Sequence, residues 1–276
     1  MASFNKIVQD IKSLKIQGAT NVAIAGLKAI SKKSRSISEF EKGIQALKRS
    51  RPTEPMLQNV LDKLSGKILK SKNLDKTLKK ETQKKISELK RSHELIAKKA
   101  QKKIKQDATL FTHCHSSTVT KAIICAKSKN VSVINTETRP RYQGRLTAKE
   151  LVGAGIKTKM IVDSAMANFI PEADCVFVGA DAMTTQFFVN KVGTFNLAIL
   201  AKLAKVPVYV LADKLKFTED VEIEYRNPKE IWSNPPKKLE IVNPAFDMIP
   251  WCLVKGVITQ DGVKKPENFV KSMNDG

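Results

Sequence analysis

The stretch ATLFTHCHSST, residues 108–118, decides how the second part of the chain folds. Its first five residues are apolar or β-branched, as in a short buried strand, and the polar turn after them opens a segment of helical pattern. Cys114 lies in that turn, just before the helix, where the positive end of the helix dipole would favour its thiolate. The alternative interpretation of Cys114 is a buried small side chain without chemistry of its own.

Four similar runs lie further along the chain, at residues 131–135, 159–162, 175–178 and 206–211, separated by segments of helical pattern. Strands that alternate with helices imply right-handed crossovers and a parallel sheet that is buried on both faces. We therefore predict an α/β fold. A helical N-terminal domain is followed, over residues 107–276, by a Rossmann-like, open, mostly parallel sheet with helices on both faces.

Every predicted strand ends in polar side chains, and parallel strands bring such ends to one edge of the sheet. These side chains are Ser116 after the first strand, Arg139 and Gln143 after the second, Asp181 after the fourth, and Asn190 and Lys191 at the start of the next helix. Ser116 either helps to bind a phosphate or carboxylate or simply caps its helix. Asp181 could act as an acid or base, or form a salt bridge with Lys191 or Arg139. We expect Cys114 and Asp181 to face one pocket at this edge.

Residues 1–106 carry most of the positive charge. They contain 27 Lys and Arg against 9 Asp and Glu, a net +18, whereas the remainder has 22 against 18, a net +4 of the total +22. Amphipathic segments at residues 4–30 (interrupted at Gly18), 36–49, 54–69 and 73–104 predict a Lys-rich helical domain that ends in a long connecting helix. The lysines suit a solvated face, as in heat-adapted proteins, or a surface for nucleic acid or an acidic protein. Aromatic residues are nearly absent there and no recognition motif occurs, so RNA binding is the less favoured interpretation.

The composition argues against several classes of protein. No apolar run reaches the roughly 18 residues of a membrane span, and the N-terminal residues lack the apolar segment of a signal peptide. We therefore expect a cytoplasmic protein without membrane contact. The four cysteines lie far apart and form no CxxC pair, so we predict neither a disulfide framework nor a metal site, and no cofactor is indicated.

The same strand-end motifs carry a resemblance to a known family. They are THCHSSTV at 112–119, ETRP at 137–140, QGRLTAKEL at 143–151, VGAD at 178–181 and NKVGT at 190–194. Together they resemble the family that joins the alpha, beta and delta subunits of translation initiation factor 2B to phosphosugar isomerases. QGA at 17–19, RPT at 51–53 and ADKLKF at 212–217 extend the resemblance over nearly the whole chain. It implies homodimers or larger homo-oligomers formed by the C-terminal domain.

In the isomerase branch of this family, which acts on methylthioribose 1-phosphate or ribose 1,5-bisphosphate, a Cys and an Asp transfer hydrogen between the first two sugar carbons. The resemblance implies these roles for Cys114 and Asp181. It places the ligand of the pocket, a phosphorylated small molecule, against positions Gln17, Gly18, Ala19, Arg51, Gln143, Asn190 and Lys191, with Ser116 and Arg139 nearby.

Two departures from the isomerase pattern bear on function. Gln17 replaces an Arg that could clamp a phosphate, and residues 184–188 (TTQFF) replace a segment with an Asn-Gly pair. They favour a non-catalytic subunit-like protein of the initiation factor 2B type, which binds initiation factor 2; guanine-nucleotide exchange would follow from the family name alone. The alternative is a phosphosugar aldose-ketose isomerase that uses Cys114 and Asp181, a pair that the regulatory subunits often lack.

Overall fold

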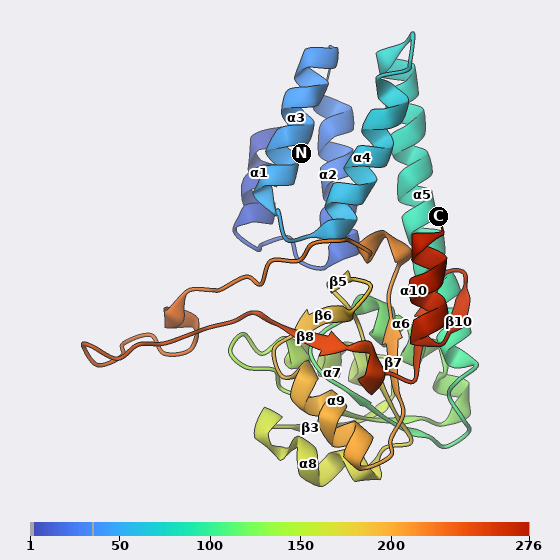
Figure 1. Ribbon diagram of the computed structural model, residues 1–276, viewed down its shortest axis with the longest axis vertical. Helices are drawn as coiled ribbons and strands as arrows, with labels where there is room; N and C mark the ends of the chain where they lie inside the picture. The colour runs from blue at the N-terminus through green and yellow to red at the C-terminus, as the bar shows by residue number, and fades with distance from the viewer. Residues whose placement is uncertain (1–2, 35, 276) are drawn as a thin grey trace. The chain divides into compact units, whose positions relative to one another are not determined.

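The computed structural model describes residues 3–34 and 36–275, and the chain divides into two compact units (Figure 1). One unit contains the residues up to Ser92 together with Leu215–Phe217. The other contains His93–Lys214 and the residues from Thr218 onward. The division falls within a single long helix, α5 (Leu74–Gln101).

The first unit is helical, as predicted. Its helices are α1 (Phe4–Lys12), α2 (Ala19–Lys33), α3 (Ile37–Ser50), α4 (Pro55–Ile68) and the first part of α5. The hydroxyls of Ser3 and Ser36 accept hydrogen bonds from backbone N–H groups three residues on and so cap α1 and α3. Gly18, at φ +82°, breaks the helical run between α1 and α2. The apolar faces of these helices meet in one core that contains Leu27, Phe40, Leu47, Leu57 and Leu61.

The second unit contains the predicted α/β sheet. Seven strands occur in the order β10-β9-β7-β4-β1-β2-β3, and every neighbouring pair is parallel except β9 and β10. They are β1 (Thr109–Thr112), β2 (Ser132–Thr136), β3 (Lys157–Ile161), β4 (Cys175–Val178), β7 (Val208–Leu211), β9 (Gly256–Thr259) and β10 (Gly262–Lys264). The five predicted strands are therefore confirmed as β1, β2, β3, β4 and β7, whereas β9 and β10 at the other edge were not predicted.

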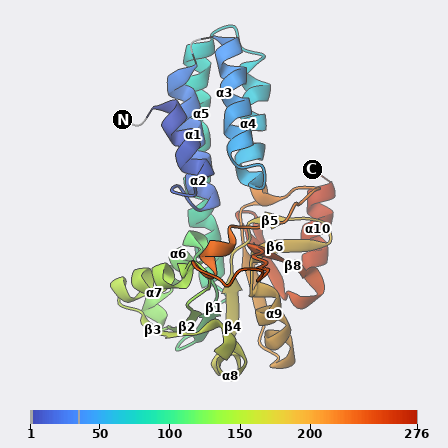
Figure 2. The ribbon, with the colours of Figure 1, turned by 90° about the vertical axis from the view of Figure 1, so that its left-hand side faces the viewer.

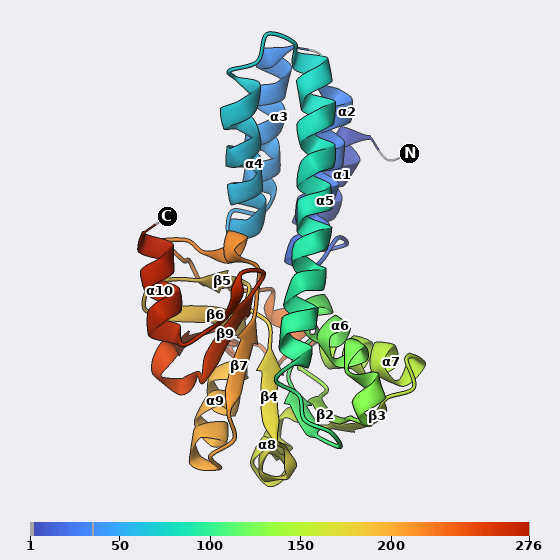
Figure 3. The same ribbon diagram turned by 90° about the vertical axis from the view of Figure 1, so that its right-hand side faces the viewer.

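Helices cover both faces of this sheet, which confirms the predicted fold class. The helices of the second unit are α6 (Ser117–Cys125), α7 (Gln143–Gly153), α8 (Met166–Phe169), α9 (Thr194–Leu203) and α10 (Pro266–Asn274). The end of α5 packs with α6 and α7 against one face, around Leu110, Val133 and Phe177 (Figure 2). The α9 helix packs against β7, on the opposite side of the sheet as right-handed crossovers require (Figure 3).

A second, antiparallel sheet was not predicted. Strands β5 (Ala182–Met183), β6 (Phe187–Lys191) and β8 (Phe246–Pro250) pair in the order β5-β6-β8. Asn190 and Lys191 therefore end a strand, and the prediction that they start a helix was wrong; α9 begins only at Thr194, after Gly193 at φ +99°. The pairing of β6 with β8 joins residues far apart in sequence, which local patterns do not reveal.

The turn between β5 and β6 explains how this chain replaces the Asn-Gly pair. The hydroxyl of Thr184 accepts hydrogen bonds from the backbone N–H groups of Gln186 and Phe187, which closes the turn without glycine. Phe188 is buried and stacks on Trp251 with ring centroids 5.4 Å apart. The two aromatic residues thus serve the second sheet and its core.

A long irregular segment, residues 218–245, joins β7 to β8 and projects as an arm in Figure 1. Its two sides are joined at an isolated bridge between Tyr225 and Pro244. The arm exposes large apolar side chains, among them Trp232, Leu239 and Val242. Over residues 3–34 and 36–275, no helix has both the length and the apolar character that crossing a bilayer demands.

Candidate active site

Cys114 lies at the carboxyl end of β1 in a backbone conformation that is unusual for a side-chain-bearing residue. Its φ is +67°, in the left-handed region. Its backbone N–H donates to the hydroxyl of Thr138 at 2.9 Å, and its carbonyl accepts from the hydroxyl of Thr147 at 2.8 Å. The loop after β2 and helix α7 thus hold both sides of the Cys114 peptide, and they fix the position of its half-buried thiol.

A chain of hydrogen bonds leads from Cys114 to the end of β6. Thr138 Oγ1 lies 3.1 Å from Thr136 Oγ1, which lies 2.6 Å from Nδ1 of His113, while Nε2 of His113 lies 2.8 Å from the carbonyl oxygen of Val192. Since a carbonyl can only accept, Nε2 carries the proton; burial lowers the pKa of His113, which leaves Nδ1 as the acceptor. The Thr138 hydroxyl can then donate to the Thr136 hydroxyl, which in turn donates to Nδ1 of the neutral His113 imidazole.

The loop after β2 is fixed by the end of β3. The carboxylate of Asp163 accepts from the backbone N–H groups of Thr138 and Arg139, at 2.8 and 2.6 Å. The peptide bond between Arg139 and Pro140 is cis. Gly144 fits so closely against this loop that a Cβ there would lie 1.7 Å from the carbonyl oxygen of Thr136. The motif ETRP and the glycine of QGR therefore form one rigid support beside Cys114.

Two predicted ligand residues of this loop have different surroundings. Gln143 is the first residue of α7, and its side-chain Oε1 is buried without a hydrogen-bond partner among the residues that the structure describes. The guanidinium of Arg139 donates to the hydroxyl of Tyr142 and, at 3.0 Å, to the carbonyl oxygen of Ile231. Gln143 thus keeps a free acceptor, whereas Arg139 helps to hold the arm.

The ends of β4 and β6 bring further predicted residues together. A Cβ on Gly179 would lie 2.8 Å from the Ser116 hydroxyl and 4.0 Å from the Asn190 side-chain oxygen, so the start of α6 and the end of β6 both approach this glycine. Asp181 pairs its backbone N–H with Val189 of β6. Within the described ranges Asp181 forms no ion pair, so the salt-bridge alternative for this carboxylate is wrong.

The Cys114 thiol is electrostatically coupled to the predicted Asp181 and Lys191. Burial raises the pKa of Cys114 to about 11; the charges of Lys191 and Arg226 oppose this rise and that of Asp181 adds to it. The expectation that the helix dipole favours the thiolate was wrong, because loss of hydration outweighs the partial charge of a helix end. At neutral pH the side chain is a protonated thiol.

Arg226 is a member of this group that the sequence did not indicate. It comes from the arm, which shows no strand or helix period and no recognisable motif around this arginine. In the sequence, Arg226 is marked by nothing more than its positive charge in the segment that leads to β8. Its place beside Lys191 depends on the pairing of the arm with the start of β8, which is a contact between distant segments.

The remaining predicted residues belong to the helical unit. The Gln17 side chain donates to the carbonyl of Leu14 at 2.7 Å, Gly18 caps α2, and Ala19 is its first residue. Arg51 caps the end of α3, and its guanidinium lies 3.9 Å from the carboxylate of Glu54. Their part in a ligand site stays a prediction.

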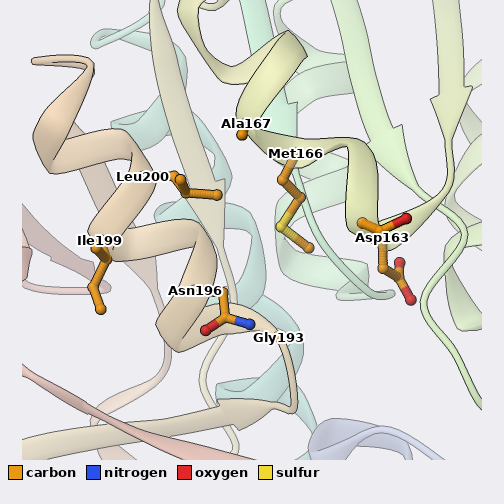
Figure 4. Close-up of a pocket in the computed structure, with 8 residues that line it drawn as sticks. Asp163, Met166, Ala167, Gly193, Asn196, Ile199 and Leu200 are labelled. Carbon is orange, nitrogen blue, oxygen red and sulfur yellow. The ribbon is translucent and has the colours of Figure 1, made fainter.

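A cavity of about 390 Å³ lies between α8 and α9 (Figure 4). It is lined by Asp163, Ser164, Met166, Ala167, Gly193, Asn196, Ile199 and Leu200. Neither Cys114 nor Asp181 contributes to its walls, so it is not the pocket expected from the sequence. In the described part of the chain, no three His, Cys, Asp or Glu side chains are grouped so that they could hold a metal ion.

Comparisons with known proteins show which family and which characterised proteins this chain is similar to. The profile of the Initiation factor 2 subunit family matches residues 15–266. A ribose 1,5-bisphosphate isomerase of Archaeoglobus fulgidus is 35% identical over 94% of this chain and 88% of its own. A methylthioribose-1-phosphate isomerase of a Thermoanaerobacter species is 32% identical over 95% and 88%. The crystal structure of a Pyrococcus horikoshii translation initiation factor eIF-2B superimposes with a TM-score of 0.85, at 28% identity over 97% of this chain and 98% of that one.

These relatives correct the main functional prediction. Both curated relatives are isomerases and match nearly the whole chain at higher identity than the structure that is named as a translation factor. The expectation of a non-catalytic subunit that binds initiation factor 2 was therefore wrong. It gave too much weight to Gln17 and to residues 184–188.

Proposed function

The chain belongs to the initiation factor 2 subunit family, and from this premise we propose that it is an aldose-ketose isomerase of a ribose phosphate. The first substrate to test is ribose 1,5-bisphosphate, the substrate in the name of the A. fulgidus relative, and methylthioribose 1-phosphate is the second. Such an isomerase oxidises one of the first two sugar carbons and reduces the other, so no external oxidant or reductant is needed.

The observation that best supports this proposal is the half-buried thiol of Cys114, held in a left-handed conformation by Thr138 and Thr147, with the charges of Lys191 and Asp181 close enough to act on its pKa. A thiol with a pKa of about 11 can donate a proton to a carbanion-like carbon, and its thiolate is basic enough to take one from carbon. We assign to Cys114 the proton exchanged with carbon and to Asp181 the proton exchanged with a sugar oxygen. The Cys114 proton first passes to Asp181; the thiolate then takes the proton from one sugar carbon while Asp181 protonates the carbonyl oxygen of the other. In the return step Asp181 takes a proton from the first carbon's hydroxyl and the Cys114 thiol gives its proton to the second carbon.

Lys191 supplies the positive charge of this site. Burial lowers the pKa of its ammonium, and the negative charges of Cys114, once it is a thiolate, and of Asp181 counteract that effect. A cation there would stabilise negative charge on a phosphate or on an oxygen of the reacting carbons. Asn190, whose amide nitrogen donates to Thr194, presents its oxygen towards Gly179 and the Ser116 hydroxyl, where a sugar hydroxyl could bind.

The test is an assay of the purified protein with ribose 1,5-bisphosphate, methylthioribose 1-phosphate and a panel of aldose 1-phosphates. We expect ketose formation from at least one of them. Cys114→Ser and Asp181→Asn should each lower kcat by 10²-fold or more, on the order expected when a proton-transfer group is removed. Cys125→Ser is the matched control, because Cys125 is exposed. No turnover of any substrate would refute the proposal.

We also infer a homo-oligomer formed through the second unit. The supporting observation is the set of large apolar side chains that this unit exposes, including Leu203 on α9 and Trp232 and Val242 on the arm. Light scattering after gel filtration should give a mass of at least twice 30.7 kDa. A monomer at micromolar concentration would contradict this inference.

A further inference from the structure

Arg226 is held by backbone pairing at the base of the arm. Its N–H donates to the carbonyl of Asn243 at 2.8 Å, and the N–H of Ala245 donates to the carbonyl of Glu224 at 2.9 Å. The Ala245 carbonyl in turn accepts from Val192, the residue after Lys191. Arg226 is thus fixed by the same hydrogen-bonded network that fixes the end of β6.

The guanidinium of Arg226 is largely enclosed, and its terminal N–H groups are unused by the described residues. Its side chain is only 10% exposed, and its Nε lies 3.1 Å from the carboxylate of Glu224, in an ion pair. None of its guanidinium N–H groups donates a hydrogen bond to another described residue, and its Nε has no partner of suitable geometry. The Nε group already faces the Glu224 carboxylate, whereas the terminal N–H groups of the guanidinium donate to no described residue and can therefore donate to an oxygen that the protein itself does not supply.

Lys191 is a buried cation that lies, like Arg226, near the ring of Phe246. The Phe246 ring centroid is 5.1 Å from Lys191 Nζ and 5.8 Å from the Arg226 guanidinium carbon. Lys191 is 5% exposed and, within residues 3–34 and 36–275, its ammonium has neither a hydrogen bond nor an ion pair. Arg226 also lowers the pKa of Lys191, after the larger effect of burial, as expected for like charges held close together.

Two largely enclosed cations with unused donors fit one small, doubly charged anion, which would share Arg226 with the Glu224 carboxylate. A phosphate monoester has that charge and offers oxygens on several sides, and the planar fork of arginine matches its geometry better than lysine does. A nucleic-acid backbone would need exposed cations, whereas Lys191 and Arg226 are buried. The charges also act on the Cys114 thiol, so the anion would lie close to the reacting group.

We propose that Arg226 is a specificity-determining residue that binds a phosphate group of the sugar together with Lys191. The proposal rests on the isomerase function proposed above. It assigns to the arm a direct part in substrate selection. Because the phosphate does not react, its contact with Arg226 contributes mainly to binding, and loss of the contact raises KM more than it lowers kcat.

The test compares Arg226→Gln and Arg226→Met with the wild type, using the substrate that turns over. We expect KM to rise about 10- to 100-fold in both, the loss typical of a hydrogen bond to a charged group, with kcat within a few-fold of wild type. Arg141→Gln is the matched control, since Arg141 forms an exposed ion pair with Glu230 of the same arm. A KM for both Arg226 variants equal to that of Arg141→Gln would overturn the proposal.

Binding of inorganic phosphate separates this proposal from the proposed function. By calorimetry, phosphate should bind the wild type and Arg141→Gln alike, and at least 10-fold more weakly to the Arg226 variants. Equal binding to all four proteins, or no binding to the wild type, would overturn the role of Arg226 even if the protein is an isomerase. Weaker binding to the variants without turnover of any sugar would support the subsite and refute only the isomerase function. The melting temperature of each Arg226 variant, compared with that of the wild type, shows whether the variant keeps the native fold.

Discussion

The backbone N–H of Cys114 donates a 2.9 Å hydrogen bond to the hydroxyl of Thr138, so the thiol-bearing residue is tied to the loop after the neighbouring strand. Both residues have positive φ, +67° and +63°, although neither is glycine and Thr138 is β-branched. Such conformations are costly and persist only where the surroundings over-determine them. Here the Asp163 carboxylate and the His113 imidazole provide that support.

Removal of the Thr138 hydroxyl should destabilise this arrangement. Thr138→Val keeps the shape but leaves the Cys114 N–H without its acceptor and breaks the chain to His113. We expect a loss of about 1–3 kcal/mol in the free energy of unfolding, measured by urea denaturation. Thr158→Val is the control, because that half-buried hydroxyl donates only to Ile156 within its own strand region. Equal losses in the two variants would contradict the special role of Thr138.

Gly144 should tolerate no side chain. In Gly144→Ala the new Cβ would lie 1.7 Å from the backbone oxygen of Thr136, so the loop or the start of α7 must move. We expect a loss of at least about 3 kcal/mol, at the upper end of the range for overpacking. In the same helix a methyl group added at Gly153 would meet no atom within 4 Å, so Gly153→Ala should be neutral or stabilising by up to about 1 kcal/mol. Chemical denaturation of both variants distinguishes these outcomes.

The stability of the fold should depend on the protonation of His113. Burial lowers its pKa below the ordinary value of 6.5, so below about pH 6.5 the unfolded chain binds a proton that the native state does not. Stability is therefore retained above this pH and lost as the pH falls towards the folded pKa, by up to about 1.4 kcal/mol per pH unit for one group. His115, whose pKa burial also lowers, adds to this slope.

The measurement is a series of urea denaturation curves between pH 7.5 and about pH 5, the range that the unperturbed histidine pKa brackets. His113→Gln removes the titrating group, so its stability should fall less steeply than that of the wild type over this range. His115→Gln is the companion variant for the second imidazole. A slope for His113→Gln as steep as that of the wild type would show that the buried imidazole is not the cause.

The thiols should differ in reactivity in an order set by burial and pKa. At neutral pH roughly one Cys114 in 10⁴ is a thiolate if its pKa is about 11, so alkylation by iodoacetamide should be slow and should accelerate with rising pH. Cys125 and Cys252 are exposed and should react first, whereas Cys175 is buried and its pKa of about 12 makes it the slowest. Mass spectrometry of timed samples gives the order; modification of Cys114 before Cys125 at pH 7 would contradict it.

Local patterns in the sequence were sufficient for five of the seven strands of the main sheet and for several members of the site, whereas β9 and β10 were not predicted. Four of these five strands are short runs rich in apolar and β-branched residues, whereas β3 carries Lys157 and Lys159 and is mostly exposed. The residues after β1, β2 and β4 include Cys114, Gln143 and Asp181. Parallel strands necessarily bring these ends to one edge, so the neighbourhood of Cys114 and Asp181 follows from the period alone. The motifs also identified the family. From the sequence alone its translation-factor branch was favoured, whereas the relatives favour the isomerase branch.

Only the tertiary structure decided the rest, because it depends on contacts between segments far apart in the chain and on burial. The pairing of β6 with β8 turned Asn190 and Lys191 from a helix start into a strand end. The backbone pairing of the arm with the residues before β8 brought Arg226 to the same site. Loss of hydration, which no sequence pattern measures, made Cys114 a protonated thiol where the helix dipole alone predicted a thiolate.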